Sequence, residues 1–279
     1  MAWPVSSWHN PGPGGSRNRF ASGILPGGER LRQGWTLLLD FLLPHACPLC
    51  RCRVEAPFAP CPDCRKGLPP QPDTLCLRCG GPTVGPEQGC GQCLGNPMAP
   101  DAFHCAFDYA DPVRGLIHGF KYGDHGEWAA GLGDLCWART GAALAWEEPD
   151  ALVPMPLHYV RLVQRRYNQS ALLAGVLARY LDRPMVTAAL RRVRRTTPQA
   201  GLNARQRRLN MQGAFVARQS LVAGRSLLLV DDVVTTGATM AAAVRALKQA
   251  GAARVAVVCL ARAVPGGIHS SASEGDEHG

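Results

Sequence analysis

Several features that would assign this chain to a common class are missing. No run approaches the roughly 20 apolar residues that a membrane-spanning helix needs, so we expect no membrane insertion. The stretch WTLLLDFLLP near the amino terminus is interrupted by Asp40, which does not fit a signal peptide and favours a cytoplasmic location. No GxxxxGKS or GxxxxGKT loop occurs, so a P-loop ATPase would lack its central feature.

Negative charge and aromatic side chains are also scarce. The chain has 21 acidic residues against 30 lysines and arginines, which gives a formal net charge of +9. This excess favours phosphate-bearing partners such as nucleotides, nucleic acid or phospho-sugars, without choosing between them. Aromatic residues make up only 6% of the chain, which leaves few platforms for stacking nucleic-acid bases.

Cysteine, by contrast, is abundant and clustered. The chain has 12 cysteines, and eight of them form four CxxC pairs between Cys47 and Cys93. Such clustering indicates metal binding in a reducing compartment rather than disulfides. Two CxxC turns supply the four thiolates of a closed tetrahedral site, so the pairs predict two structural Zn²⁺ ions. The predicted ligands are Cys47, Cys50, Cys61, Cys64, Cys76, Cys79, Cys90 and Cys93.

The pairing of the CxxC turns and the role of the metal module stay open from the sequence. The two ten-residue gaps, 51–60 and 80–89, favour one zinc for the first two pairs and one for the last two. An interleaved arrangement is the alternative, and an iron–sulfur cluster is the minor competitor. The module either completes the main domain or contacts nucleic acid. Cys52 is a spare ligand or a bystander thiol, and Cys105, Cys136 and Cys259 are expected in the core.

Composition divides the chain into four parts. Residues 1–33 and 266–279 are polar and lack apolar periodicity, so we predict two disordered tails. Residues 34–100 form the predicted double zinc-ribbon domain, which has too little apolar material to fold without metal. Residues 101–265 alternate apolar strands with helices, which predicts an α/β domain built on a parallel sheet. Expected strands are AFDYA, ALVPMP, LLLVDDV and ARVAVVCLA, and expected helices are GLIHGFKYG, residues 168–181 and residues 239–250.

The run LLLVDDVVTTGAT, residues 227–239, carries the strongest ligand-binding signal. Asp231 and Asp232 follow an apolar strand at its carboxyl end, where open α/β sheets bind ligands. The residues after them turn into a helix, whose first N–H groups suit a phosphate dianion. The predicted phosphate-binding residues are Thr235, Thr236, Gly237, Ala238 and Thr239.

This run resembles the PRPP-binding motif of the type I phosphoribosyltransferases. The resemblance implies that Asp231 and Asp232 hold the 2′ and 3′ hydroxyls of the ribose of Mg·PRPP, while the following loop holds its 5′-phosphate. Thr235 stands where purine-using members often carry Asp. Because Thr cannot act unaided as a general base, this difference disfavours a purine salvage reaction.

Residues 161–208 contain twelve arginines and a single acid, Asp182. Placement after a predicted strand end favours contact with phosphate or pyrophosphate for Arg161, Arg165 and Arg195. Arg205, Arg207 and Arg208 fit a solvated basic face equally well. The segment RRVRRTTPQAGLNARQRRLN, residues 191–210, is predicted to be a mobile loop.

Together with VPMPLHYVRLVQRRYNQ and TPQAGLNARQRRLN, the acidic run resembles the ComF family, which includes ComFC and the GntX-type proteins. The resemblance spans Phe41 to Arg262 and includes LIHGFKYGD, with His118 and Lys121; these two residues and His158 are further site candidates. Arg166 stands where the family's common RGFNQ has glycine. The resemblance implies a phosphoribosyltransferase-like parallel sheet flanked by helices, preceded by a zinc ribbon, with Mg·PRPP as ligand and a link to DNA uptake.

Three functions are compatible with this sequence. The chain could be a phosphoribosyltransferase that acts on PRPP with an acceptor that the residues do not identify. It could instead be a non-catalytic competence factor that binds single-stranded DNA and works with other competence proteins. The third alternative is a regulator that senses PRPP. The sequence does not separate enzyme from sensor, because both need the same loop, and it does not specify the oligomeric state.

Overall fold

The structure is a computed structural model that describes the chain between residues 45 and 263 with several gaps. The described residues are 45–54, 58–71, 75–83, 90–91, 93–123, 125–157, 166–194, 211 and 213–263. Both predicted tails, 1–33 and 266–279, lie outside them, so their disorder stays a prediction. No helix among the described residues is long and apolar enough to cross a membrane.

A four-stranded, fully parallel sheet in the order β1-β6-β5-β2 forms the centre of the fold. The two middle strands are continuous apolar runs, and Leu227–Val230 and Val255–Val258 are at most 2% exposed. Such runs are typical of strands covered on both faces, which confirms the predicted parallel sheet. The strands are β1 (Ala102–Asp108), β2 (Ala151–Pro154), β5 (Ser226–Val234) and β6 (Arg254–Arg262).

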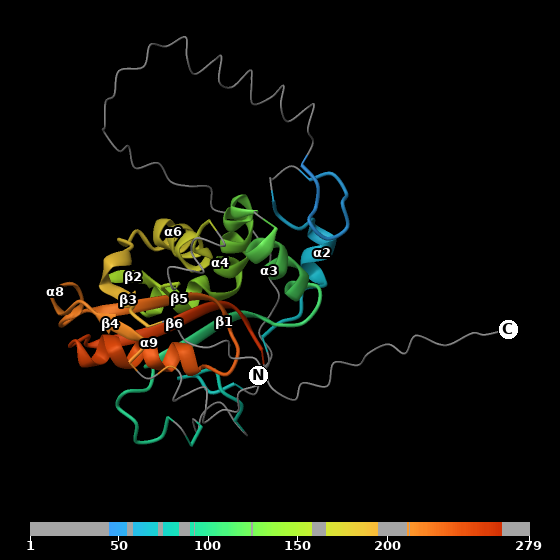
Figure 1. The fold of residues 1–279 in the computed structure, drawn as a ribbon. Coiled ribbons are helices and arrows are strands. Elements are labelled where there is room, and N and C mark those ends of the chain that lie inside the picture. The colour runs from blue at the N-terminus through green and yellow to red at the C-terminus, as the bar shows by residue number, and fades with distance from the viewer. Residues whose placement is uncertain are drawn as a thin grey trace, which may run out of the picture. The chain divides into compact units, whose positions relative to one another are not determined.

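Helices cover both faces of this sheet (Figure 1). Helices α3 (Val113–Tyr122), α4 (Ala129–Trp146) and α6 (Gln169–Leu181) bury their apolar sides against one face. Helix α9 (Ala238–Gln249) packs on the other face, together with the short α8 (Gln219–Val222). The sequence did not predict α4, which is buried along much of its length and lacks the one-sided apolar pattern of a surface helix.

A two-stranded antiparallel sheet lies beside α9. It pairs β3 (Leu190–Arg192) with β4 (Phe215–Ala217) and buries Leu190 and Phe215 in the same core as α9. The prediction of a mobile loop over 191–210 is therefore wrong at its start, because Arg191 and Arg192 belong to a paired strand. The rest of that segment, from residue 195 on, lies outside the described residues. Two short 3₁₀ helices complete the described elements, η2 (Gly126–Trp128) and η3 (Thr187–Ala189).

The cysteine-rich segment contributes little regular structure. Its described elements are the one-turn helix α2 (Pro62–Lys66) and single antiparallel bridges that close two CxxC turns, Ala46–Arg53 and Leu75–Pro82. Its own buried cluster contains only Cys76, Cys93 and Ala99. Leu68 and Leu75 instead join the two cores of the α/β domain, one on each face of the sheet. The segment is thus packed onto the domain that follows it.

Candidate ligand site and cysteine clusters

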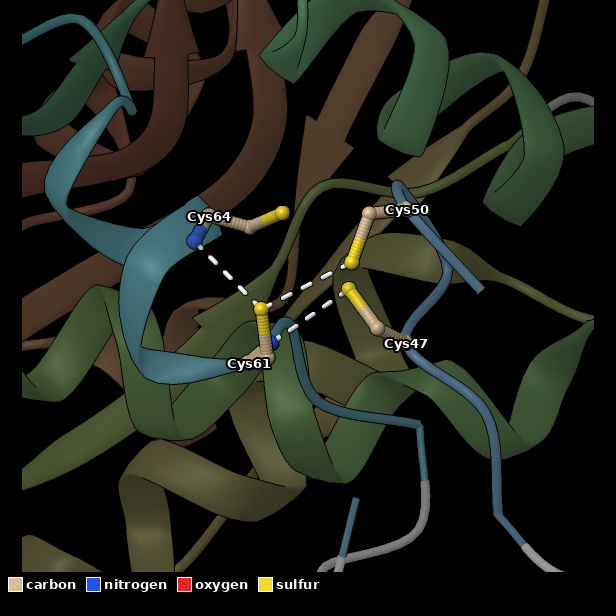
Figure 2. A group of neighbouring side chains, drawn as sticks. All are labelled: Cys47, Cys50, Cys61 and Cys64. Carbon is tan, nitrogen blue, oxygen red and sulfur yellow. Dashed lines mark hydrogen bonds between the residues drawn. The ribbon is translucent and has the colours of Figure 1, made fainter. Parts of the chain in front are cut away.

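The first two CxxC pairs converge on one point. The sulfur atoms of Cys47, Cys50, Cys61 and Cys64 all lie within 4.8 Å of one another, and the Sγ atoms of Cys50 and Cys61 are 3.7 Å apart. Figure 2 shows Cys47 and Cys50, from one segment, facing Cys61 at the start of α2. Cys61 is the N-cap of α2, and its Sγ accepts the Cys64 N–H at 3.5 Å. This group is called the first cluster below.

The last two pairs form a second cluster of the same kind, made of Cys76, Cys79, Cys90 and Cys93. The Sγ atoms of Cys79 and Cys90 are 3.4 Å apart, and the sulfurs of Cys79 and Cys76 accept backbone N–H groups from Gly81 and Cys90 at 3.4 Å. The predicted grouping, first two pairs and last two pairs, is confirmed, and the interleaved alternative is excluded.

Both clusters fit structural zinc. Four sulfurs at a Zn–S distance of about 2.3 Å in a tetrahedron lie about 3.8 Å apart, close to the 3.7 Å and 3.4 Å found between turns. Hydrogen bonds from backbone N–H groups to the sulfurs stabilise thiolates, which are the form of cysteine that binds metal. Cys52 is exposed and lies outside the first cluster, whereas Cys105, Cys136 and Cys259 are buried core residues, as predicted.

The acid pair, Asp231 and Asp232, lies inside β5 rather than after it. β2 ends at Pro154, which pairs with Val230, while β5 continues alongside β6 to Val234. The two acids therefore extend past the carboxyl end of β2. In an open α/β sheet, ligands bind at the carboxyl ends of two neighbouring strands whose following helices lie on opposite faces of the sheet. β2 and β5 are such a pair, since α6 and α9 cover opposite faces.

Two side chains from α3 and α6, the helices on one face of the sheet, contact the acid pair. The Lys121 Nζ atom, at the end of α3, is 3.0 Å from Asp232 Oδ2, and the side chains of the two residues are only 16% and 10% exposed. Ser170, in the first turn of α6, donates its hydroxyl to Asp231 Oδ1 at 3.0 Å. The partial neutralisation by Lys121 lets two adjacent carboxylates share one half-buried site.

The pKa of Asp231 is raised toward neutral pH. Burial, reinforced by the charge of Asp232, raises the pKa of Asp231 to about 7, although Lys121 and the Ser170 hydroxyl act in the opposite direction. Desolvation disfavours the charged carboxylate, and a like charge next to it adds to that cost. A group with such a shifted pKa in a crevice marks a candidate functional site.

The TTGAT loop, residues 235–239, connects the acid pair to α9. Gly237 has a φ of 76° at the N-cap position, a left-handed conformation that glycine adopts without strain. The first bond of the helix joins Ala241 N to Gly237 O at 2.8 Å, so the preceding N–H groups have no acceptor inside the helix. Among the described residues, no side chain caps this end, and the buried Thr236 Oγ1 atom has no hydrogen-bond partner.

A hydrogen-bond network joins the start of α6 to the end of β2 and to the last turn of α3. Asn168 caps α6 by accepting the Ser170 N–H at 3.1 Å, and its amide donates to Met155 O, just past β2, at 3.0 Å. The Tyr167 hydroxyl donates to Phe120 O at 2.7 Å, which ties α6 to the last turn of α3. The side chains of Lys121 and Ser170 are thereby held on neighbouring elements that face the acid pair.

The acid pair, Lys121 and the TTGAT loop line one pocket. It contains the predicted residues Asp231, Asp232, Thr235, Thr236, Gly237, Ala238 and Thr239, together with Lys121, Met155, Pro156, Leu157, Arg192, Val233, Val234 and Met240. Of the other candidates, His118 is exposed, and its ring lies tilted against that of Tyr122, with 4.8 Å between ring centroids. Arg161, Arg165, Arg195, Arg205, Arg207, Arg208 and His158 lie outside the described residues, so their predicted roles stay predictions.

Sequence reasoning missed two residues of this site. Arg192 lies in the pocket from β3, and its guanidinium sits 5.7 Å from the centre of the Phe215 ring. A pattern of apolar and basic residues over 190–193 was the available signal for a strand, but the surrounding arginines obscured it. Ser170 carries no signal of its own, since its contact with Asp231 depends on how α6 packs against β5.

The fold and the site define a class: an α/β protein with a phosphoribosyltransferase-like ligand crevice and two zinc-ribbon cysteine clusters. Comparison with known families agrees. The phosphoribosyl transferase domain family matches residues 168–274, and the double zinc ribbon domain family matches residues 38–94.

Individual relatives match about three quarters of this chain. DNA utilization protein YhgH of Escherichia coli (strain K12) is 37% identical, with 79% of this chain and 98% of that protein covered. Competence protein F of Haemophilus influenzae is 33% identical over 73% of this chain and 90% of that protein. Competence protein ComFC of Bacillus subtilis is 27% identical over 75% and 74%. The chain belongs to the ComF family.

Proposed function

We propose that this chain binds Mg·PRPP in the pocket at the carboxyl ends of β2 and β5. The observation that carries the proposal is the meeting of three features in one pocket: the acid pair, Lys121 and the uncapped start of α9. Carboxylates accept hydrogen bonds from vicinal hydroxyls, and the N-terminus of a helix binds a phosphate dianion. A ribose 5-phosphate unit presents both kinds of group on one rigid ring.

In this proposal, the 5′-phosphate lies in the TTGAT loop and accepts N–H groups from the first turn of α9. The buried hydroxyl of Thr236 supplies a further donor for the phosphate. Asp231 and Asp232 accept the 2′ and 3′ hydroxyls, and Lys121 lowers the repulsion between the two carboxylates. Mg²⁺ bound to the pyrophosphate of PRPP would supply charge neutralisation there. Arg192 is placed to contribute positive charge to the same pocket.

The pocket favours positioning over covalent catalysis. Transfer from PRPP requires an acceptor to attack C1 as pyrophosphate leaves, which depends on orientation and charge stabilisation rather than on a protein nucleophile. Thr235 cannot remove a proton from an acceptor unaided. An acceptor for this site would therefore carry its own reactive lone pair, as an amine does.

Turnover separates an enzyme from a sensor. The zinc-loaded protein is incubated with Mg·PRPP and a panel of amines and nucleobases, and pyrophosphate release is followed. An enzyme releases pyrophosphate at a rate that depends on one acceptor, and a Lys121→Met variant is slower. Binding without release for any acceptor would assign the site to sensing, while absence of binding would contradict the proposal itself.

The names of the relatives extend the proposal to DNA. A DNA utilization protein and two competence proteins share most of their length with this chain. We propose that this chain also acts in the handling of incoming single-stranded DNA, in contact with other competence proteins. Its formal charge of +9 and its arginine-rich segment supply the electrostatic attraction that such a role needs.

Salt dependence tests the DNA role. If several lysines and arginines contact phosphates, the affinity for a fluorescent single-stranded oligonucleotide falls by about 10²-fold or more between 50 and 200 mM salt. Fluorescence anisotropy measures this directly, with a polyanion such as heparin as the non-nucleic competitor. Affinity that does not change with salt, or equal displacement by heparin and DNA at matched charge, would count against a DNA-specific role.

A further inference from the structure

One buried arginine of the described chain has no role in the account so far. Arg262, the last residue of β6, is only 2% exposed. Within the described residues no carboxylate pairs with it, and its guanidinium donates to three backbone carbonyls instead. Burial of a charge without an opposite charge is costly, so such a residue needs a compensating environment.

The three carbonyls come from three segments, one of which directly follows Arg262. Arg262 Nε donates to Gly80 O at 2.5 Å, and Gly80 directly follows the cluster ligand Cys79. Arg262 Nη1 donates to Val234 O at 3.0 Å and to Ala263 O at 2.9 Å. Val234 is the residue directly before the TTGAT loop. A single side chain therefore joins the second cysteine cluster to the end of β5.

The segment of the second cluster is docked closely at this point. Gly80 has a φ of 62°, and a Cβ atom added to it would lie 2.2 Å from the Phe103 ring. Phe103 N also donates to Leu77 O, inside the CLRC turn, at 2.7 Å. The turn that carries Cys76 and Cys79 thus lies against β1 without room for a side chain, and its carbonyls are fixed in position for Arg262.

We propose that Arg262 is a positioning residue that makes the geometry of the TTGAT loop depend on the metal-bound state of the second cluster. The segment of the first cluster lies instead against α4, where Phe58 and Ala59 approach Gly131. The structural link stands on its own contacts, whereas its effect on ligand affinity rests on the proposed Mg·PRPP site.

Hydrogen exchange of the ligand-free protein tests the link without relying on PRPP. Peptides that cover residues 231–240 are compared in the wild type, in Arg262→Met, and in a second-cluster variant, Cys76→Ser with Cys93→Ser. We expect exchange in this segment to become about tenfold faster in both variants. Combining the two changes adds little, because both break one connection. Zinc analysis confirms that Arg262→Met still binds two ions.

Two matched controls separate this effect from general destabilisation. Arg254→Met removes a guanidinium at the other end of β6, where it pairs with Glu147 at 2.6 Å, and should leave exchange in 231–240 within twofold of wild type. Cys47→Ser with Cys64→Ser opens the first cluster and should do the same. Wild-type exchange in Arg262→Met, or equal acceleration by the first-cluster variant, would overturn the proposal; if the cysteine variants do not fold, Arg262→Met and Arg254→Met decide it.

Affinity for Mg·PRPP supplies the functional readout. Arg262→Met should raise the Kd about tenfold and Arg254→Met should not change it. If the wild type does not bind Mg·PRPP, the proposed function fails, and the exchange data still judge the coupling. If the wild type binds and Arg262→Met binds equally well with unchanged loop exchange, the coupling fails while the ligand site stands.

Discussion

The Asp231→Asn variant is expected to be more stable than the wild type at pH 8 and unable to bind Mg·PRPP well. Burial and the charge of Asp232 raise the pKa of Asp231 to about 7, so at pH 8 the folded protein carries a carboxylate that its surroundings disfavour. Asparagine keeps an oxygen that can accept the Ser170 hydroxyl but removes the charge. We expect a gain of about 2 kcal/mol in the free energy of unfolding, roughly half of what the full shift would give, because the side chain is partly exposed.

The pH dependence fixes the sign of this effect. The folded-state pKa of Asp231 lies above the ordinary aspartate value of 3.8, so between about pH 4 and pH 7 the folded protein holds a proton that the unfolded chain has released. Wild-type stability should therefore fall as the pH rises through this window and level off above it. The variant lacks this contribution. Denaturant unfolding of the wild type and the variant at pH 4.5 and pH 8 measures this difference. An Asp231→Asn variant that is less stable than the wild type at pH 8 would refute the raised pKa of Asp231.

Loss of both metal ions is expected to have the largest effect on stability. The buried cluster inside the cysteine-rich segment contains only Cys76, Cys93 and Ala99, so the segment has almost no apolar interior of its own. Structural zinc contributes about 10 kcal/mol or more to small sites of this type. If only half of this free energy stabilises the folded domain, removal of both ions should still lower the Tm by more than about 10 °C.

Calorimetry of zinc-free and zinc-loaded protein measures this loss. Leu68 and Leu75 belong to the two cores of the α/β domain, so release of the segment should loosen both faces of the sheet rather than leave it intact. Adding back Zn²⁺ should restore the original Tm, and elemental analysis should find two ions per chain. An unchanged Tm after verified removal of both ions would show that the clusters do not support the fold.

Local sequence patterns predicted the central sheet and the cysteine ligands because each depends on residues close together in the chain. Leu227–Val230 is apolar enough to identify a buried strand without tertiary information, and each CxxC turn has one geometry. The grouping of the four turns required the structure, since the ten-residue gaps allowed more than one arrangement. Helix α4 escaped prediction because its buried faces leave no periodic polar stripe.

Contacts between residues far apart in the chain could not be predicted in this way, even for Lys121, which was a site candidate. Lys121 reaches Asp232 and Arg262 reaches Gly80 only because the sheet brings distant segments together. The arginine-rich segment illustrates the opposite case: its charge pattern marked a basic region, yet the arginine that lines the pocket among the described residues is Arg192, which belongs to a strand. Charge patterns identify a surface; pairing and packing decide which side chain faces the ligand.

The most direct test of the central claim is calorimetric titration of Mg·PRPP into the zinc-loaded wild type and into the Asp231→Asn/Asp232→Asn variant. Each carboxylate that accepts a ribose hydroxyl contributes about 1.5 kcal/mol or more, so the double variant should bind at least about 100-fold more weakly. We expect one binding site per chain in the wild type and little measurable heat from the variant. Equal binding by both proteins, or none by the wild type, would contradict the assignment of this pocket.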